Sequence, residues 1–362
     1  MHHPFEPARM DERRRTFLEE LLTTPTPSGF EVQGQRLWTE YVSEFADDVR
    51  TDDYGNAVAV HEGSGDGPSI AFTGHSDEIG FMVRRITDDG FIRISPIGGA
   101  DRTVSQGQHV TVHAEAPIHG VVGQTAIHLR DVGEEEYDDI QEQFVDIGVD
   151  DGDEAQELVD VGDPVTVSTT VKQLQGGRVA ARGMDNRIGV WSAAEGLRRA
   201  VEADVDATVY AVSTVQEEVG LQGAKMVGFD LAPDAAIAVD VTHATDHPDL
   251  EEKRRGPIEL GEGPVIARGS ANHPVLVDLA REAADSAAID VQLQAAGVRT
   301  GTDADAFYTS RGGIPSLNVG LPNRYMHTPV EVIDTADLDA VAELLGAMAS
   351  TAGDREDFAV EI

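Results

Sequence analysis

The sequence predicts an α/β protein with a small all-β domain inserted into it. Apolar segments with strand and helix periods alternate along 1–80 and again along 171–362. Between them, 81–170 holds short β-rich segments separated by Gly and Asp turns, which is typical of a barrel or a sandwich. We therefore expect a catalytic domain with a mixed sheet, built from 1–80 and 171–362, and a β-rich domain over 81–170.

The first part of the α/β domain begins with two helices, separated by a turn rich in proline, and continues with strands. An Asp-Tyr-Gly-Asn turn indicates a hairpin, and a short buried strand then leads into Gly74-His75-Ser76-Asp77-Glu78. The expected elements are helix 8–22, helix 31–46, the hairpin turn 53–56, strand 57–61 and strand 70–73.

The same sequence patterns predict the elements of the insert and of the second part of the α/β domain. Strands are expected in the insert, and only its acidic stretch over 131–160 has a helical period. Asp334 or Thr335 is a plausible N-cap of the closing helix. The expected strands are 81–86, 91–94, 109–113, 120–127, 164–168, 208–215, 235–241, 291–295 and 316–320, and the expected helices are 188–203, 274–287 and 335–351.

The charge balance is extreme for a globular chain. The formal net charge is −39, and only three of the 27 basic residues are lysines. Such self-repulsion is tolerable where salt screens it, and molar salt shortens the Debye length to ~3 Å. The composition therefore indicates a halophilic, cytoplasmic protein. An acidic surface also argues against nucleic acid and anionic membrane as partners.

Cysteine is absent, so disulfides and thiolate ligands are excluded, and any metal must be held by His, Asp and Glu. No run of 18 or more apolar residues is present, and the first residues lack the apolar core of a signal peptide. We expect a protein that neither crosses a membrane nor is exported.

A strand that ends in two adjacent carboxylates is the most informative stretch. Val209–Val215 is rich in β-formers and is followed by Glu217 and Glu218. Open α/β sheets bind ligands at the carboxyl ends of their strands. Adjacent carboxylates repel, so a folded site that holds both needs a cation, a shared proton or solvent.

A His or an acid also follows a strand or precedes a helix, beside glycine, at several other places. Convergence of these groups at one sheet edge would supply ligands for two divalent cations ~3.5–4 Å apart. His and carboxylate without sulfur suit Zn, Co or Mn, with His favouring zinc over magnesium. The additional residues are His75, Asp77, Asp185, Asp240 and His327.

The spacing of these residues suggests roles for two of them. In His75-Ser76-Asp77, the Asp carboxylate can orient the imidazole. Of Glu217 and Glu218, one can bind metal while the other holds a proton from the attacking water. Asp303 and Asp305, in a loop with glycine, face the substrate or serve as turn residues. The role of His243 stays open.

As a set, these motifs resemble the tetrahedral aminopeptidases, which are dinuclear metallo-aminopeptidases related to glutamyl and deblocking aminopeptidases. The shared stretches occur in the family's order along nearly the whole chain. They are Pro27-Ser28-Gly29-Phe30-Glu31, Gly74–Phe81, Met184-Asp185-Asn186-Arg187, Val215–Gly220, Gly301-Thr302-Asp303-Ala304 and Arg324–Pro329.

The resemblance implies a function and a role for each site residue. His75 and Asp240 would hold one metal, Glu218 and His327 the other, and Asp185 would bridge them. Glu217 would be the general base, and Asp77 would orient His75. The substrates would be short peptides with a free N-terminus. The insert at 81–170 would be a dimerisation domain, and dimers would assemble into a hollow dodecamer.

Three alternatives remain open from the residues. A related dinuclear amidohydrolase, such as a deacylase or carboxypeptidase, would share the metal ligands but act on blocked or C-terminal groups. A glycoside hydrolase would use two carboxylates without metals. A non-catalytic assembly protein would not depend on Glu217.

Overall fold

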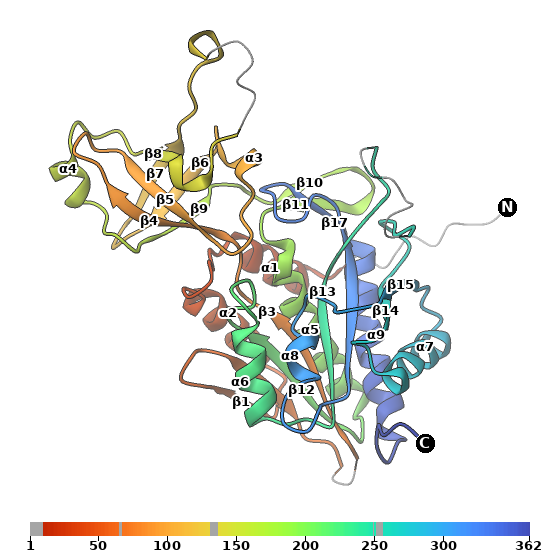
Figure 1. The fold of residues 1–362 in the computed structure, drawn as a ribbon. Coiled ribbons are helices and arrows are strands. Elements are labelled where there is room, and N and C mark those ends of the chain that lie inside the picture. The colour runs from red at the N-terminus through yellow and green to blue at the C-terminus, as the bar shows by residue number, and fades with distance from the viewer. Residues whose placement is uncertain (1–9, 65–66, 131–136, 249, 251–255) are drawn as a thin grey trace.

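The computed structural model describes residues 10–64, 67–130, 137–248, 250 and 256–362. A large α/β domain carries a smaller β barrel that projects from one side, at the upper left of Figure 1. Among the described helices, none is long and apolar enough to span a bilayer. The predicted combination of a mixed-sheet α/β domain and an all-β insert is confirmed.

A sheet of eight strands forms the centre of the α/β domain. Its four central strands are parallel: β3 pairs with β12 and β13, and β13 pairs with β16. Their carboxyl ends therefore meet at one edge of the sheet. In spatial order the strands are β1 (Asp48–Thr51), β2 (Ala57–His61), β12 (Thr208–Thr214), β3 (Ser69–His75), β13 (Ala235–His243), β16 (Ser316–Asn323), β14 (Val265–Gly269) and β15 (Gln292–Ala296).

Helices cover both faces of this sheet, so its central strands are apolar on both sides. On β13, Ile237 and Val239 belong to the larger core, while Ala236 packs on the opposite face with Phe307. The larger core includes α1 (Glu12–Thr23), α2 (Val32–Val42), α5 (Met184–Ala203), α7 (Pro274–Ala287) and α9 (Thr335–Gly353), and the opposite face is covered by α6 (Gln222–Asp230) and α8 (Ala304–Phe307).

The insert is a closed barrel in which neighbouring strands pair antiparallel. It buries its own apolar core, which includes Ile92, Ile94, Val112 and Val145. Its strands, in spatial order, are β4 (Gly80–Ile86), β5 (Ile92–Ile97), β8 (Phe144–Asp146), β7 (Pro117–Val122), β6 (His109–His113) and β9 (Pro164–Val167), with the short helices α3 (Arg102–Ser105) and α4 (Gly152–Gln156) beside them.

A small sheet of three strands lies between the barrel and the N-terminal end of α9. Its strands are β10 (Lys172–Gln173), β11 (Arg178–Ala181) and β17 (Glu331–Asp334), and all pair antiparallel. Single turns of 3₁₀ helix occur at Ile127–Leu129, Ile140–Glu142 and Gln175–Gly177. As predicted, Asp334 caps α9, because its side chain accepts a hydrogen bond from the backbone of Ala336.

Several predicted boundaries were wrong. Helix α1 begins at Glu12 because Asp11 caps it; of the predicted helix 8–22, residues 8–9 lie outside the described residues. Helix α2 ends at Val42, short of 46. The strand predicted at 120–127 occupies Pro117–Val122 instead, where its pairing with β6 sets the register.

The acidic stretch over 131–160 is not one helix. Residues 131–136 lie outside the described part, and the rest holds β8 and the short α4. Pairing of β8 with β5 and β7 overrides the helical period of this segment. Helix α6 and strands β14 and β17 were not predicted.

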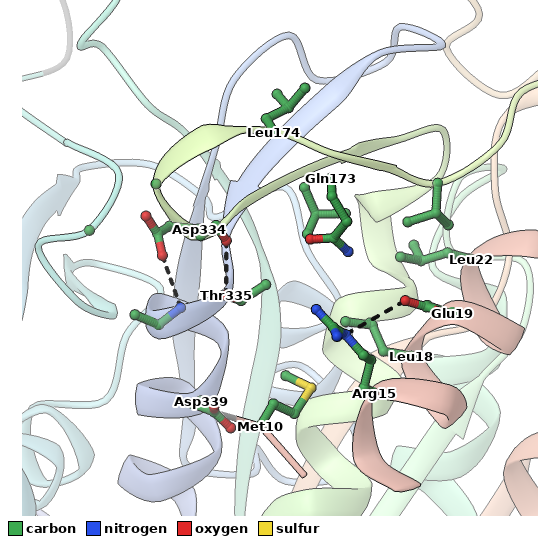
Figure 2. Close-up of a pocket in the computed structure, with 16 residues that line it drawn as sticks. Met10, Arg15, Leu18, Glu19, Leu22, Gln173, Leu174, Asp334, Thr335 and Asp339 are labelled. Atoms are coloured by element: carbon green, nitrogen blue, oxygen red, sulfur yellow. Dashed lines mark hydrogen bonds and ion pairs between the residues drawn. The ribbon is translucent and has the colours of Figure 1, made fainter. Parts of the chain in front are cut away.

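A cavity of about 560 Å³ lies between α1, the small sheet and the start of α9 (Figure 2). Its charged groups have partners within the fold: Arg15 lies 3.7 Å from Glu19, and Asp339 pairs with Arg14. No histidine is found among the lining residues that the structure describes. We therefore place the candidate functional site elsewhere, at the carboxyl edge of the central sheet.

Candidate metal centre

Four neighbouring strands deliver predicted site residues to one edge of the sheet. His75 is the last residue of β3, Glu217 and Glu218 follow β12, and His327 follows β16. Asp240 was expected at the end of its strand but lies within β13, which continues to His243. The parallel register still brings all of them to the same edge, as the sequence predicted.

Asp185 reaches this edge from the start of α5, which crosses closely over β3. The close approach depends on glycine, because a Cβ on Gly74 would collide with the backbone of Gly189. Asp185 Oδ1 lies 3.1 Å from His75 Nε2, and Asp185 Oδ2 lies 3.2 Å from His327 Nε2. One carboxylate therefore faces both histidines, with a different oxygen toward each.

The residues form two groups that share Asp185. One group is His75, Asp185 and Asp240; the other is Asp185, Glu218 and His327. Within each group, the possible ligand atoms lie within 4.8 Å of one another. This is the arrangement that a bridging carboxylate between two cations requires.

The chemistry of the donors also fits a divalent metal. Imidazole nitrogen with carboxylate oxygen, and no sulfur, is the ligand set of zinc and its neighbours. Glu218 Oε1 is buried, and its contact with His327 Nε2 is long, at 3.5 Å. A buried carboxylate oxygen without a close partner is costly unless a cation is bound to it.

Electrostatics point to the same requirement. Burial, together with the nearby carboxylates of Asp240 and Asp303, raises the pKa of Glu217 to about 10. Burial also raises the pKa of Asp240 well above its ordinary value. Hydrogen bonds to Asp185 and Glu218 raise the pKa of His327 to about 11. The carboxylates of Glu217 and Asp240 oppose joint ionisation, while those of Asp185 and Glu218 attract positive charge, and a bound divalent cation would satisfy both tendencies.

Asp77 lies behind His75, as the His-x-Asp spacing predicted. His75 Nδ1 is 3.4 Å from Asp77 Oδ1 and 3.1 Å from the Asp77 backbone oxygen. Both side chains are buried. In the neutral ring that binds a cation through Nε2, the proton sits on Nδ1, where these acceptors would hold it.

Sequence reasoning missed Glu331. This buried carboxylate accepts hydrogen bonds from the backbone N–H of His327, at 2.9 Å, and from that of Asp185, at 3.2 Å. It thereby ties together two candidate ligands that are distant in sequence. Its only signal in the sequence is an acid four residues after His327, which is too common to single out.

Glu31 lies in one of the shared motifs, but the sequence did not indicate a role for it. It is buried and accepts hydrogen bonds from the backbone N–H of Gly29, at 2.8 Å, and of Gln216, at 3.1 Å. Burial raises its pKa to about 7. Glu31 thus supports the turn that carries Glu217, next to the candidate centre.

The two acids at the start of α8 differ in their surroundings. Asp303 is buried behind the centre, and one of its oxygens accepts a hydrogen bond from Thr214 Oγ1 at 2.6 Å. Asp305 instead accepts from the backbone N–H of Thr300 and of Gly301, at 3.0 and 2.8 Å. Asp305 therefore stabilises a turn, whereas Asp303 adds negative charge near Glu217.

A cleft of about 340 Å³ opens directly onto the candidate ligands. Beyond the ligands and Glu217, its lining includes Thr242, Gln294, Asn318 and His243. Its volume is in the usual range for a small-molecule or peptide-end site. A histidine–carboxylate centre in a cleft at the carboxyl edge of an α/β sheet defines a candidate metal-dependent hydrolase.

Comparison with known proteins gives the family. The model of the M42 glutamyl aminopeptidase family matches residues 55–344, and the chain belongs to this family. The lysyl aminopeptidase of Pyrococcus furiosus is 33% identical over 341 residues, which cover 91% of this chain and 95% of that protein.

Solved structures agree. The TET aminopeptidase of a marine sediment archaeon of the Thaumarchaeota superposes with a TM-score of 0.88 at 29% identity, covering 94% of this chain and 96% of that chain. The TET1 peptidase of Pyrococcus horikoshii, which can assemble into a tetrahedron or a large octahedral shell, gives 0.82 at 30% identity, covering 93% and 99%. The resemblance predicted from the motifs is confirmed, and the chain is an aminopeptidase.

Proposed function

We propose that the chain removes N-terminal residues from short peptides with a free N-terminus, using two divalent cations. His75 and Asp240 would hold one cation, Glu218 and His327 the other, and Asp185 both. The observation that carries this proposal is the position of Asp185, which turns one oxygen toward each histidine. Zinc suits these donors best, and cobalt or manganese would also fit.

The chain's own residues have distinct parts in the reaction. When bound, the cations polarise the peptide carbonyl and make the attacking water more acidic. Glu217 accepts the water's proton at its carboxylate and then delivers it to the leaving amine. Glu217 Oε2 lies 3.9 Å from His75 Nε2, at the border of the first group. The acidic cleft attracts the protonated α-amine of the peptide, which selects a free N-terminus.

Peptide hydrolysis tests this proposal. Free amino acids would be measured from matched unblocked and N-acetylated peptides in about molar KCl, before and after chelation. Release from unblocked peptides alone, lost on chelation and restored by Zn, Co or Mn, is the expected result. Release from blocked peptides alone would indicate a deacylase-type amidohydrolase. Chelator-resistant sugar release would indicate a glycoside hydrolase.

We propose further that the barrel formed by residues 81–170 is a dimerisation domain and that dimers assemble into a dodecamer. The support comes from structural similarity to the TET1 peptidase of Pyrococcus horikoshii, which forms closed shells. Light scattering after size exclusion in KCl would measure the assembly. A mass twelve times that of the 38.7 kDa chain is expected. A monomer or an isolated dimer would contradict the assembly.

The net charge of the chain bears on the salt concentration in which this enzyme works. With a net charge of −39, we propose that it works in a salt-rich cytoplasm, with neither nucleic acid nor membrane as a partner. Salt that screens self-repulsion should raise the stability of the fold. Thermal melts from 0.1 to about 3 M KCl should show the midpoint rising with salt. A midpoint independent of salt would contradict the halophilic assignment.

A further inference from the structure

A short loop of the barrel reaches the candidate metal centre. This loop, Gly98-Gly99-Ala100-Asp101, connects β5 to α3. The barrel packs around its own core, separate from that of the α/β domain. The loop therefore brings backbone from the insert to residues that follow β12 and β16 of the central sheet.

Both glycines of the loop lie against candidate ligands. The Gly99 backbone oxygen is 3.2 Å from His327 Nδ1. A Cβ on Gly99 would lie 2.8 Å from His327 Nδ1 and 2.9 Å from Cε1. A Cβ on Gly98 would lie 3.1 Å from Glu218 Cβ. Only residues without side chains allow this approach.

The contact determines which nitrogen of His327 carries the proton. A carbonyl oxygen can only accept, so Nδ1–H donates to Gly99. In the neutral ring that a bound cation requires, Nε2 is then the unprotonated nitrogen, and it points toward Asp185 Oδ2 and Glu218 Oε1, at 3.2 and 3.5 Å. An acceptor on the far nitrogen of a metal-binding imidazole fixes its tautomer and its orientation.

The two histidines of the centre differ in where this acceptor comes from. His75 Nδ1 faces Asp77, which is buried within the same domain. His327 Nδ1 faces a backbone carbonyl of the barrel, and the His327 side chain is 33% exposed. The position of the barrel therefore bears directly on His327, whereas the acceptor of His75 comes from its own domain.

We propose that Gly99 is a positioning residue, through which the barrel orients His327 and controls the cation site formed by Asp185, Glu218 and His327. This inference rests on the proposed function, because it requires His327 to bind a cation. It assigns the insert a part in the active centre in addition to any part in assembly. It also means that a substitution outside the ligands can weaken one cation site and leave the affinity of the other unchanged.

Gly99→Ala tests the proposal, because the added methyl group meets the His327 ring. No positive φ is recorded for Gly99, so alanine suits its backbone. Gly312→Ala is the matched control: Gly312 also lacks a positive φ, and its Cβ would meet nothing within 4 Å. The full-length enzymes would be stripped with chelator and titrated with Co²⁺, following its visible absorption and the metal retained per chain.

Two cobalt sites are expected in the wild type and in the control. In Gly99→Ala, one site should keep its affinity and the other should weaken by roughly 10- to 100-fold. His327→Ala should weaken the same site, and the circular dichroism and assembly mass should match those of the control. Equal weakening of both sites, or of neither, would overturn the proposal. Failure of the wild type to bind cobalt would instead refute the proposed function.

Discussion

The carboxylate of Asp77 accepts a hydrogen bond from the backbone N–H of Glu217, with 2.9 Å between nitrogen and Oδ1. Its other oxygen accepts from the backbone of Glu218, at 3.1 Å, and from Ser28 Oγ, at 2.6 Å. Asp77 also faces His75 Nδ1. A single buried acid thus links the proposed base, one ligand from each cation group and the N-terminal segment.

Asp77→Asn should lower kcat without unfolding the chain. The amide keeps one acceptor oxygen but replaces the other with a donor, which faces the N–H group of either Glu217 or Glu218 and weakens the support of the centre. Loss of such an outer partner typically lowers metal affinity or activity by roughly 10- to 100-fold. Steady-state kinetics and metal retention would measure it, with exposed Asp53→Asn as the control. Unchanged kinetics would contradict the positioning role of Asp77.

Glu217→Gln should remove the proton carrier while leaving both cation sites intact. General acid–base groups contribute roughly 10²–10⁴-fold to rate, and kcat should fall by that factor. Metal content should stay at the wild-type value because Glu217 belongs to neither candidate ligand group. The control is Glu157→Gln, which alters an exposed carboxylate of the barrel. Retention of full activity by Glu217→Gln would show that Glu217 is not the proton carrier.

The cleft should disfavour an acidic N-terminal residue. Its described lining contains neither lysine nor arginine. Two polar side chains of the lining bond to each other, since Thr242 Oγ1 donates a hydrogen bond to Gln294 Oε1 at 3.0 Å. A substrate carboxylate would enter without a lysine or arginine partner in the described lining, which is unfavourable. The kcat/KM for Asn-Ala should exceed that for Asp-Ala by roughly tenfold or more. Gln294→Lys should bring the two kcat/KM values closer together, because it places a cation in the cleft. Faster cleavage of Asp-Ala by the wild type would show that this account of the cleft is wrong.

Glu78 should make the fold sensitive to acid. Buried Glu78 pairs with Arg182 and Arg187 and, although burial opposes its charge, these cations lower its pKa from 4.5 to about 2. Since the folded pKa is the lower one, the stabilisation is complete above pH 4.5 and is lost as the pH falls through 2. The ionised Glu78 carboxylate thus contributes about 3 kcal/mol to the free energy of unfolding.

Denaturant unfolding of wild type and Glu78→Gln between pH 7 and pH 2 would measure this contribution. At pH 7 the variant should be less stable by about 3–5 kcal/mol, because the two arginines stay buried without their counter-charge. The difference should shrink toward pH 2. A difference that is constant with pH would show that the titration of Glu78 contributes nothing to the acid sensitivity.

Most of the architecture could be predicted because it depends on local patterns. The predicted helix 274–287 and strand 109–113 match α7 and β6, because an apolar period and flanking breakers are properties of adjacent residues. The strand predicted at 120–127 was misplaced because the register of β7 depends on β6 and β8. The segment over 137–160 was misassigned for the same reason.

For the candidate centre, the sequence by itself determined the residue types and their places after strands, which is why all seven predicted residues lie at one sheet edge. Only the tertiary structure decided what holds them there. Glu331 joins Asp185 to His327, and Gly99 comes from a different domain to meet His327. Such contacts leave no local pattern, because hydrogen bonds between distant segments depend on how strands and domains pack, and a backbone carbonyl has no side chain to recognise.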